Sequence, residues 1–156
     1  MGVNTTLYRF MRNQDGITSI DASSWGITNA LTTFQDAFMT SEITDIEFGS
    51  GSDFSGVTTF QNCFLTCGDL TSIDFPTNAD FSAVTNMTNF MTSTNTNMST
   101  AEYDNFLLRF DATNTNDGIT LSFGQCTYTG GGAVATAHAA IEATGAGNTI
   151  IDGGTA

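Results

Sequence analysis

A pattern of apolar residues that recurs three times constrains this chain more than any other feature. Each copy opens with an aliphatic residue, Thr, a polar residue, Ile and an acid, and large apolar residues follow 14, 17 and 21 positions after its first residue. The copies begin at Ile17, Ile43 and Leu70, which are 26 and 27 residues apart. An internal period of this length is typical of a solenoid, in which no single unit buries its apolar face alone.

Each copy predicts two elements with different periodicities. Residues 45–48 alternate polar and apolar side chains, as do residues 19–22 and 72–75, which predicts a short strand in every copy. Residues 57–64 instead place apolar side chains at positions i, i+3 and i+7, which predicts a short helix or helical turn. We therefore expect an α/β, leucine-rich-repeat-like solenoid with a parallel sheet on one face and short helices on the other.

The last third of the chain departs from the repeat and predicts a helical C-terminal cap. Ser99 and Glu102 form a capping-box pattern at the start of a helix. The buried face of this helix is expected to consist of large apolar side chains, namely Tyr103, Phe106, Leu107 and Phe110. Residues 119–123 and 149–151 then predict a fourth and a fifth strand, on either side of an alanine-rich helix over 133–143 with Gly145 just beyond its end.

These signals predict one repeat domain with a short segment in front of it. The expected divisions are an N-terminal arm or cap at 1–16, repeats at 17–42, 43–69 and 70–98, and the C-terminal cap at 99–156.

Four segments resemble the BspA-like, leucine-rich-repeat-like family of surface-protein repeats. They are LTSIDFPTNADFSAVTNMTNFM, STAEYDNFLLRF, ITLSFG and the closing TIIDGG, and the resemblance covers roughly residues 17–154. It implies a protein-interaction or adhesion module, not an enzyme.

The charge balance narrows the classes of partner. Sixteen acidic residues face three arginines and no lysine, so the net charge is −13. Contacts to nucleic-acid phosphates need clustered lysine or arginine, and an anionic membrane repels such a chain. We therefore expect neither nucleic-acid binding nor membrane insertion, and we expect solubility in a medium whose cations screen the repulsion.

The cysteines and the single histidine predict no metal, cofactor or catalytic site. Cys63 and Cys67 are four positions apart across a helix end and a loop, which is poor geometry for a disulfide, and we expect all three cysteines to be reduced. No Ser or Cys nucleophile with an orienting acid is placed around His138, which we expect to be a packed or solvated side chain. Trp25 is expected to cover the end of the core, and Arg109 to be solvated.

One candidate binding surface follows from the predicted strands. If their isoleucines point inward, Asp21, Glu47 and Asp74 point outward at equivalent positions, with Asp45 nearby. The simpler interpretation is a solvated face whose repulsion is tolerated. The functional one is weak binding of a divalent cation, or of a cationic or hydroxyl-rich partner.

A second candidate surface lies in the N-terminal segment. It carries two of the three arginines and several apolar side chains, and the residues expected to matter are Leu7, Tyr8, Arg9, Phe10 and Arg12. The segment is interpreted either as a cap on the open end of the solenoid or as an arm that docks on a neighbouring subunit.

These features together favour a non-enzymatic protein of a virus-particle surface. The N-terminal residues lack an apolar run long enough for a signal peptide, so we expect the protein to leave the cell in virus particles as a capsid decoration or a tail or fibre component that serves host attachment. Its partners would be other virion structural proteins, further copies of itself, and a host surface protein or glycan. The alternative is a bacterial cell-surface adhesion module, located outside the cell, that binds protein or glycan. A cement protein without a ligand is a third possibility.

Overall fold

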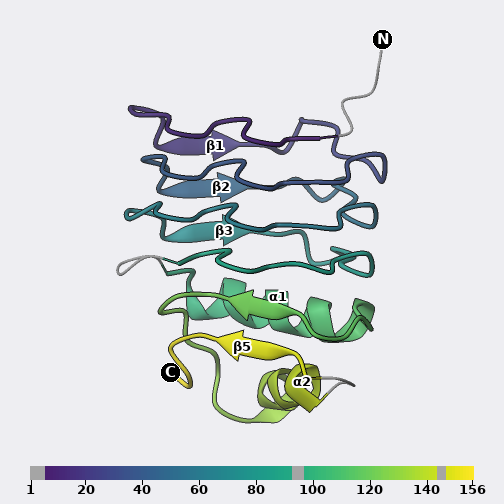
Figure 1. Cartoon of the computed structure of the whole chain (residues 1–156). Helices are drawn as coiled ribbons and strands as arrows, with labels where there is room; N and C mark the ends of the chain where they lie inside the picture. Colours follow the sequence, from purple (N-terminus) through teal and green to yellow (C-terminus); the bar gives the residue numbers. More distant parts are fainter. Residues whose placement is uncertain (1–5, 93–96, 144–146) are drawn as a thin grey trace.

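Successive layers of chain stack along one axis to make up the molecule (Figure 1). The structure, a computed structural model, describes residues 6–92, 97–143 and 147–156. Its elements follow in the order β1 (Ser19–Asp21), β2 (Asp45–Glu47), β3 (Ser72–Asp74), α1 (Thr100–Thr113), β4 (Thr120–Ser122), α2 (Gly132–Ala143) and β5 (Thr149–Ile151). It is therefore a mixed α/β structure with short parallel sheets and two helices.

The predicted strands of the three copies form one side of the stack, which we call the strand side. The strands β1, β2 and β3 pair in parallel in that order, and Ile20 lies opposite Ile46, which lies opposite Ile73. All three isoleucines are buried. The predicted strand positions and their inward-facing residues are confirmed.

On the opposite side of these layers the prediction of short helices is wrong. Residues 33–40, 59–66 and 86–92, which we call the turn side, contain turns and isolated parallel bridges and no helix. Their backbone bonds to the next layer, as in the 3.0 Å bond from Phe34 N to the Thr59 carbonyl and the 2.9 Å bond from Phe60 N to the Asn86 carbonyl. The i, i+3, i+7 spacing of apolar residues is thus produced here by a series of turns, which bury the same residues as a helix would.

Left-handed residues explain why the turn side is not helical. One position of each layer has a positive φ of 55° or 56°, occupied by Asp36, Asn62 and Asn89. A right-handed helix cannot contain this conformation, and Asn and Asp adopt it at the least cost among residues with a Cβ. Their side chains bond to one another between layers, with Asn62 donating to Asp36 at 3.0 Å and Asn89 donating to Asn62 at 3.2 Å.

The N-terminal segment adds half a layer to the turn side. The backbone N–H groups of Leu7, Arg9 and Met11 donate to the carbonyls of residues 33, 35 and 37 at 2.9, 3.1 and 2.6 Å. Arg9 has a φ of 56° and so repeats the left-handed position of Asp36. Residues 7–13, the N-terminal half layer, therefore lie on the chain's own first repeat as a cap does, while docking on a neighbouring subunit stays a prediction.

Helices replace strands on the strand side in the C-terminal third. Asn105 and Arg109 of α1 donate side-chain bonds to the carbonyls of Phe75 and Ala79, which follow β3, at 3.1 and 3.0 Å, and α2 packs against α1. The strand β4 instead continues the turn side, because Met91 N donates to the Ser122 carbonyl at 2.9 Å. β4 and β5 pair in parallel as a separate sheet and do not extend β1–β3.

The start of α1 agrees with its sequence signal. Ser99 and Glu102 form the predicted capping box, and the four predicted apolar residues are the buried ones. The predicted strands at β4 and β5 and the second helix are also present, whereas Gly145 lies outside the described residues. The prediction of a solvated Arg109 is wrong, because its side chain is half-buried and donates a hydrogen bond to the Ala79 carbonyl.

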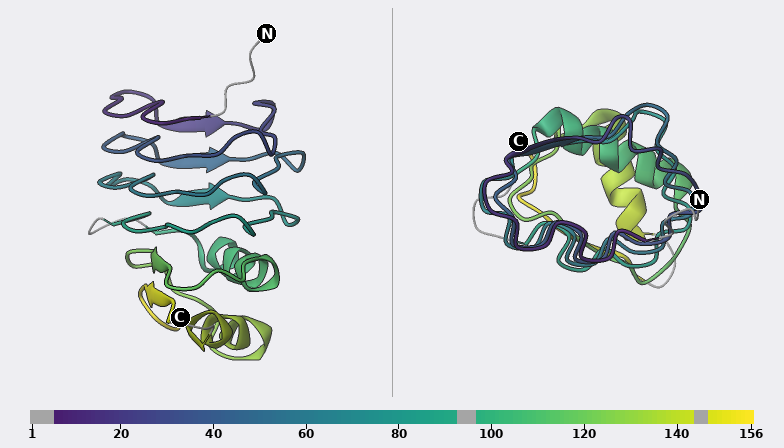
Figure 2. Two further views of the ribbon diagram at one scale, coloured as in Figure 1. Left: turned by 45° about the vertical axis from the view of Figure 1, so that its right-hand side comes forward. Right: turned by 90° about the horizontal axis from the view of Figure 1, so that it is seen from above.

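Seen along the stack axis, the layers lie over one another as closed outlines (Figure 2). The core between their two sides is rich in buried phenylalanine. Phe34 stacks on Phe60 at 5.1 Å between ring centroids, and Phe38 stacks on Phe64 at 5.2 Å. Because the layers are in register, rings at the same position of the first two copies meet, while Met87 and Met91 hold these positions in the third copy. All three cysteines are free and buried in this interior. Among the described residues, no helix has both the length and the apolar character needed to cross a bilayer.

Candidate functional site

The predicted acidic residues form an in-register column on the exposed face of β1–β3. Asp21 lies opposite Glu47, and Glu47 lies opposite Asp74, because each follows the inward isoleucine of its strand. All three side chains are exposed. Parallel strands are about 4.8 Å apart, so like charges at this spacing repel by about 1 kcal/mol in water. A column of this kind attracts cations and basic groups.

The pKa values of the carboxyl groups are shifted in opposite directions at the two ends of this acidic column. Bonds from Ser23 lower the pKa of Asp21. Desolvation, followed by the negative charge of Glu102, raises the pKa of Asp74. Glu102 stands at the first turn of α1, where the Ser72 hydroxyl donates a hydrogen bond to it. It therefore extends the negative surface beyond β3, and sequence reasoning missed this because it assigned Glu102 to the helix cap alone.

Asp45 is held by hydroxyl groups beside the column. It accepts hydrogen bonds from Ser19 Oγ at 2.6 Å and from Thr44 Oγ1 at 2.8 Å. Ser19 and Asp45 are register partners across β1 and β2. This carboxylate consequently joins two strands, which leaves Asp21, Glu47 and Asp74 as the acids with the greater freedom to meet a partner. Among the described residues, no group of three or more His, Cys, Asp or Glu side chains has the arrangement of a metal site.

The residues predicted for assembly lie at the N-terminal end of the stack. Tyr8 and Phe10 are 47% and 54% exposed. Leu7 packs partly into the core, while Arg9 pairs with Asp36 at 3.3 Å and lies over the Tyr8 ring. Arg12 is half-buried, and its Nε is buried without a hydrogen-bond partner. The structure thus brings the predicted set together on one end face.

An apolar cavity of about 400 Å³ opens at the same end. Its lining comes from the N-terminal half layer and from the loop after β1, namely Leu7, Phe10, Trp25, Gly26, Ile27, Thr28 and Leu31. Trp25 contacts Phe10 edge-on at 5.4 Å and stacks over Phe38 at 6.4 Å. Trp25 therefore covers the end of the core, as predicted, and it also forms a wall of the cavity.

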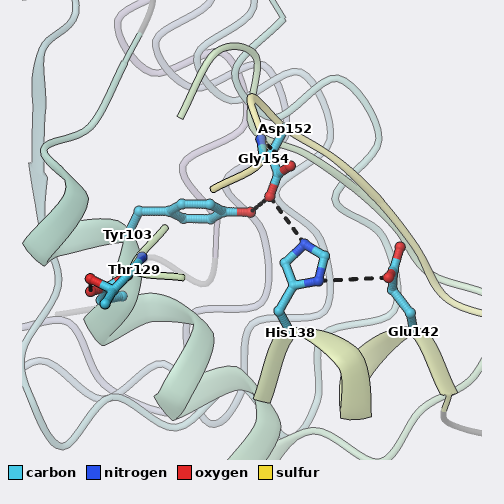
Figure 3. A network of polar contacts seen from close by, with 7 residues as sticks. Tyr103, Thr129, His138, Glu142, Asp152 and Gly154 are labelled. Carbon is cyan, nitrogen blue, oxygen red and sulfur yellow. Dashed lines mark hydrogen bonds and ion pairs between the residues drawn. The ribbon is translucent and has the colours of Figure 1, made fainter. Parts of the chain in front are cut away.

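A polar network connects the two C-terminal units (Figure 3). The Tyr103 hydroxyl donates to Asp152 Oδ2 at 2.7 Å, and His138 Nε2 lies 3.2 Å from the same oxygen. On the other side of the ring, His138 Nδ1 lies 3.6 Å from Glu142. The imidazole also stacks on Tyr128 with 4.3 Å between ring centroids. Of the two states expected for His138, packed or solvated, the structure shows the packed one, since only 13% of its side chain is exposed.

Burial keeps two side chains in and beside this network protonated. Burial and the bond to Asp152 raise the pKa of Tyr103, which keeps its hydroxyl protonated as a donor. The thiol of Cys126 has its pKa raised to about 11 by burial, so it is protonated and a poor nucleophile at neutral pH. Sequence reasoning did not foresee the meeting of Tyr103, His138 and Asp152, because they are far apart in the chain and no short motif links them.

Comparisons with models of known families, with curated proteins and with solved structures find no match for this chain. A function must consequently be argued from the arrangement of its own residues. Two surfaces stand out, the acidic column on the strand side and the apolar end face around Phe10 and Trp25.

Proposed function

We propose that this chain is a leucine-rich-repeat-like solenoid that acts as a non-enzymatic recognition protein on the surface of a virus particle. The observation that carries the proposal is the column of Asp21, Glu47 and Asp74, held in register on an exposed face. Support for a rigid display comes from the stacked phenylalanine rings beneath it. A capsid decoration, or a tail or fibre component, would use such a face for host attachment.

The chemistry of the column defines the partner. Three exposed carboxylates in line suit a surface rich in Lys or Arg, or a glycan whose hydroxyl groups donate hydrogen bonds to them. Salt would weaken binding to a basic partner, because exposed charges are screened within about 10 Å at 0.1 M salt. Binding to a neutral glycan would depend much less on salt, which separates the two partner classes.

Neutralising the column tests the proposal. The triple variant Asp21→Asn, Glu47→Gln, Asp74→Asn removes three negative charges from the strand side without changing side-chain size. A matched control, Asp69→Asn, Asp111→Asn, Asp117→Asn, removes three exposed charges that lie outside β1–β3. Both variants would be compared with the native chain for binding to candidate host cells and to glycan arrays. We expect the first triple variant to lose binding and the control to retain it.

Copurification distinguishes the two locations that the proposal allows. A virion component is recovered with purified particles in fixed stoichiometry. A cell-surface adhesion module, the alternative function, instead binds cells or glycans as an isolated chain and is absent from particles. Equal binding by the native chain and the column variant would refute the recognition role of the acidic face in both settings.

A further inference from the structure

The N-terminal end of the stack is a step, because the last layer at this end is present on the turn side and absent on the strand side. On the turn side, residues 7–13 lie above residues 33–39. On the strand side, the outermost element is β1, at the edge of its sheet, and no described residue pairs with its outer edge. The chain therefore supplies one half of an additional layer and leaves the other half open (Figures 1 and 2).

The open half of the step is apolar and offers backbone groups. The 400 Å³ cavity lies between the N-terminal half layer and the loop after β1, with Phe10 and Trp25 in its walls. Three of the five large apolar residues that are exposed in the described chain, Tyr8, Phe10 and Ile17, lie in this N-terminal region. An unpaired strand edge beside exposed aromatic rings is a site for strand addition.

The charges of the step have opposite signs on its two halves. Arg9 and Arg12, two of the three arginines of the chain, belong to the N-terminal half layer, where Arg9 pairs with Asp36 and keeps half of its side chain exposed. The open half carries the exposed carboxylate of Asp21 at the end of β1. Any acidic partner of this chain, including another copy with its net charge of −13, meets the least repulsion where these arginines lie.

We propose that two copies of the chain join through these steps, related by a two-fold axis parallel to the strands. This rotation places the turn side of one copy above the strand side of the other. The half layer of each copy then fills the open half of its partner and runs antiparallel to the partner's β1. Such an interface is self-complementary and closed, because residue i meets j and j meets i.

The same rotation satisfies the apolar and charged groups together. The half layer with Arg9 and Arg12 lies against the strand that ends in Asp21, and this pairing occurs twice. Each copy also covers the other's cavity with apolar side chains from its end face. A head-to-tail arrangement would lack this match, because the C-terminal end presents α2 where β1 requires a strand. The inference is independent of the proposed function.

Sedimentation equilibrium of the full chain tests the interface. Phe10→Asp places a charge in the joint at a residue that is 54% exposed, and Leu108→Asp is the matched control on α1, where Leu108 is 38% exposed. We expect a dimer for the native chain and the control. For Phe10→Asp we expect a dissociation constant raised at least about 30-fold, as for a buried aromatic anchor. An unchanged circular dichroism spectrum would show that the variant folds. A native chain that stays monomeric would overturn the proposal. It would do so even if a small apolar dye bound in the cavity.

Cross-linking tests the geometry independently of affinity. The native cysteines are buried, so introduced thiols report the contact alone. A mixture of Tyr8→Cys and Ser23→Cys chains should form the mixed dimer with a short thiol cross-linker, because the antiparallel half layer places Tyr8 over the residues that follow β1, and neither variant should link to itself. Linking of Tyr8→Cys to Ile151→Cys chains, whose introduced thiols both lie on the turn side, would show head-to-tail stacking and would refute the two-fold joint.

Discussion

The two ends of the molecule build the same kind of layer from different elements. In the first three layers a three-residue strand faces a turning segment, and phenylalanine rings stack between them. In the last two layers a helix takes the place of that strand, while β4 and β5 continue the turn side. The difference shows that the turn side sets the register of the whole stack, and that the other side accepts a strand or a helix.

The two regions also differ in what holds them together. The interior of the N-terminal layers is almost wholly apolar, whereas α2 buries only Ala137 and Ile141 and depends on the bonds around Asp152. Local stability follows buried apolar contact. We therefore expect the last layer to open before the first three, and four measurements test this difference.

The largest effect is expected from Phe60→Ala. Phe60 is 1% exposed, and its ring contacts those of Phe34 and Phe90 in the layers on either side. Truncating a buried phenylalanine costs about 3–5 kcal/mol, because transfer energy is lost and a cavity remains. Urea unfolding measures this loss, with Leu108→Ala as the exposed control. A loss below about 1 kcal/mol would show that the rings are not the main support of the stack.

Tyr103→Phe should affect the C-terminal layers selectively. It removes the donor to Asp152 and leaves a largely buried carboxylate with one partner fewer. The expected cost is about 1–3 kcal/mol. Amide hydrogen exchange should show reduced protection in β5 and unchanged protection in β2. An equal loss of protection in both strands would mean that the two regions unfold as one unit.

Thiol labelling compares the two regions within the native chain. Burial raises the pKa of Cys63 well above its usual value and that of Cys126 to about 11, so neither reacts at pH 8 without opening. We expect Cys126 to be labelled at least about tenfold faster than Cys63, equivalent to about 1.4 kcal/mol of difference in opening free energy. Peptide mass spectrometry after timed alkylation measures the two rates. Faster labelling of Cys63 would reverse the order of opening.

The smallest effect is expected from Asp74→Asn, at the boundary between the regions. The pKa of Asp74 is raised from its usual 3.8, so just above that pH the folded state binds more protons than the unfolded state. The contribution of this group to stability therefore falls as the pH rises through this window. The variant should gain stability at pH 7, by at most about 0.5 kcal/mol, and the gain should vanish below the window. Thermal unfolding at both pH values measures it, and destabilisation at pH 7 would contradict the assignment.

Much of the fold could be predicted from the repeat. The alternation around Ile20, Ile46 and Ile73 predicted three strands and their register, because side-chain burial in a strand has a period of two. The capping box at Ser99 and the apolar face of α1 were equally readable, since both signals are local. The acidic column followed directly from the register.

Other features depend on information that periodicity does not contain. The spacing of Val57, Phe60 and Phe64 fits a helix, yet Asn62 between them adopts a left-handed conformation. Asn or Asp at the same position in each copy was the available signal. The N-terminal half layer had a signal too, because Leu7 lies 27 positions before Phe34. The network around Asp152 had none, since the chain brings its members together only through tertiary packing.

Because the layers are equally spaced, the length of the molecule is proportional to its number of repeats. Each repeat of 26 or 27 residues adds one strand to the strand side, and one strand spacing is about 4.8 Å. Duplicating residues 43–69 would move the end face with Phe10 away from the C-terminal helices by that increment and leave both surfaces intact. The number of repeats thus sets the distance between the N-terminal end face and the C-terminal helices.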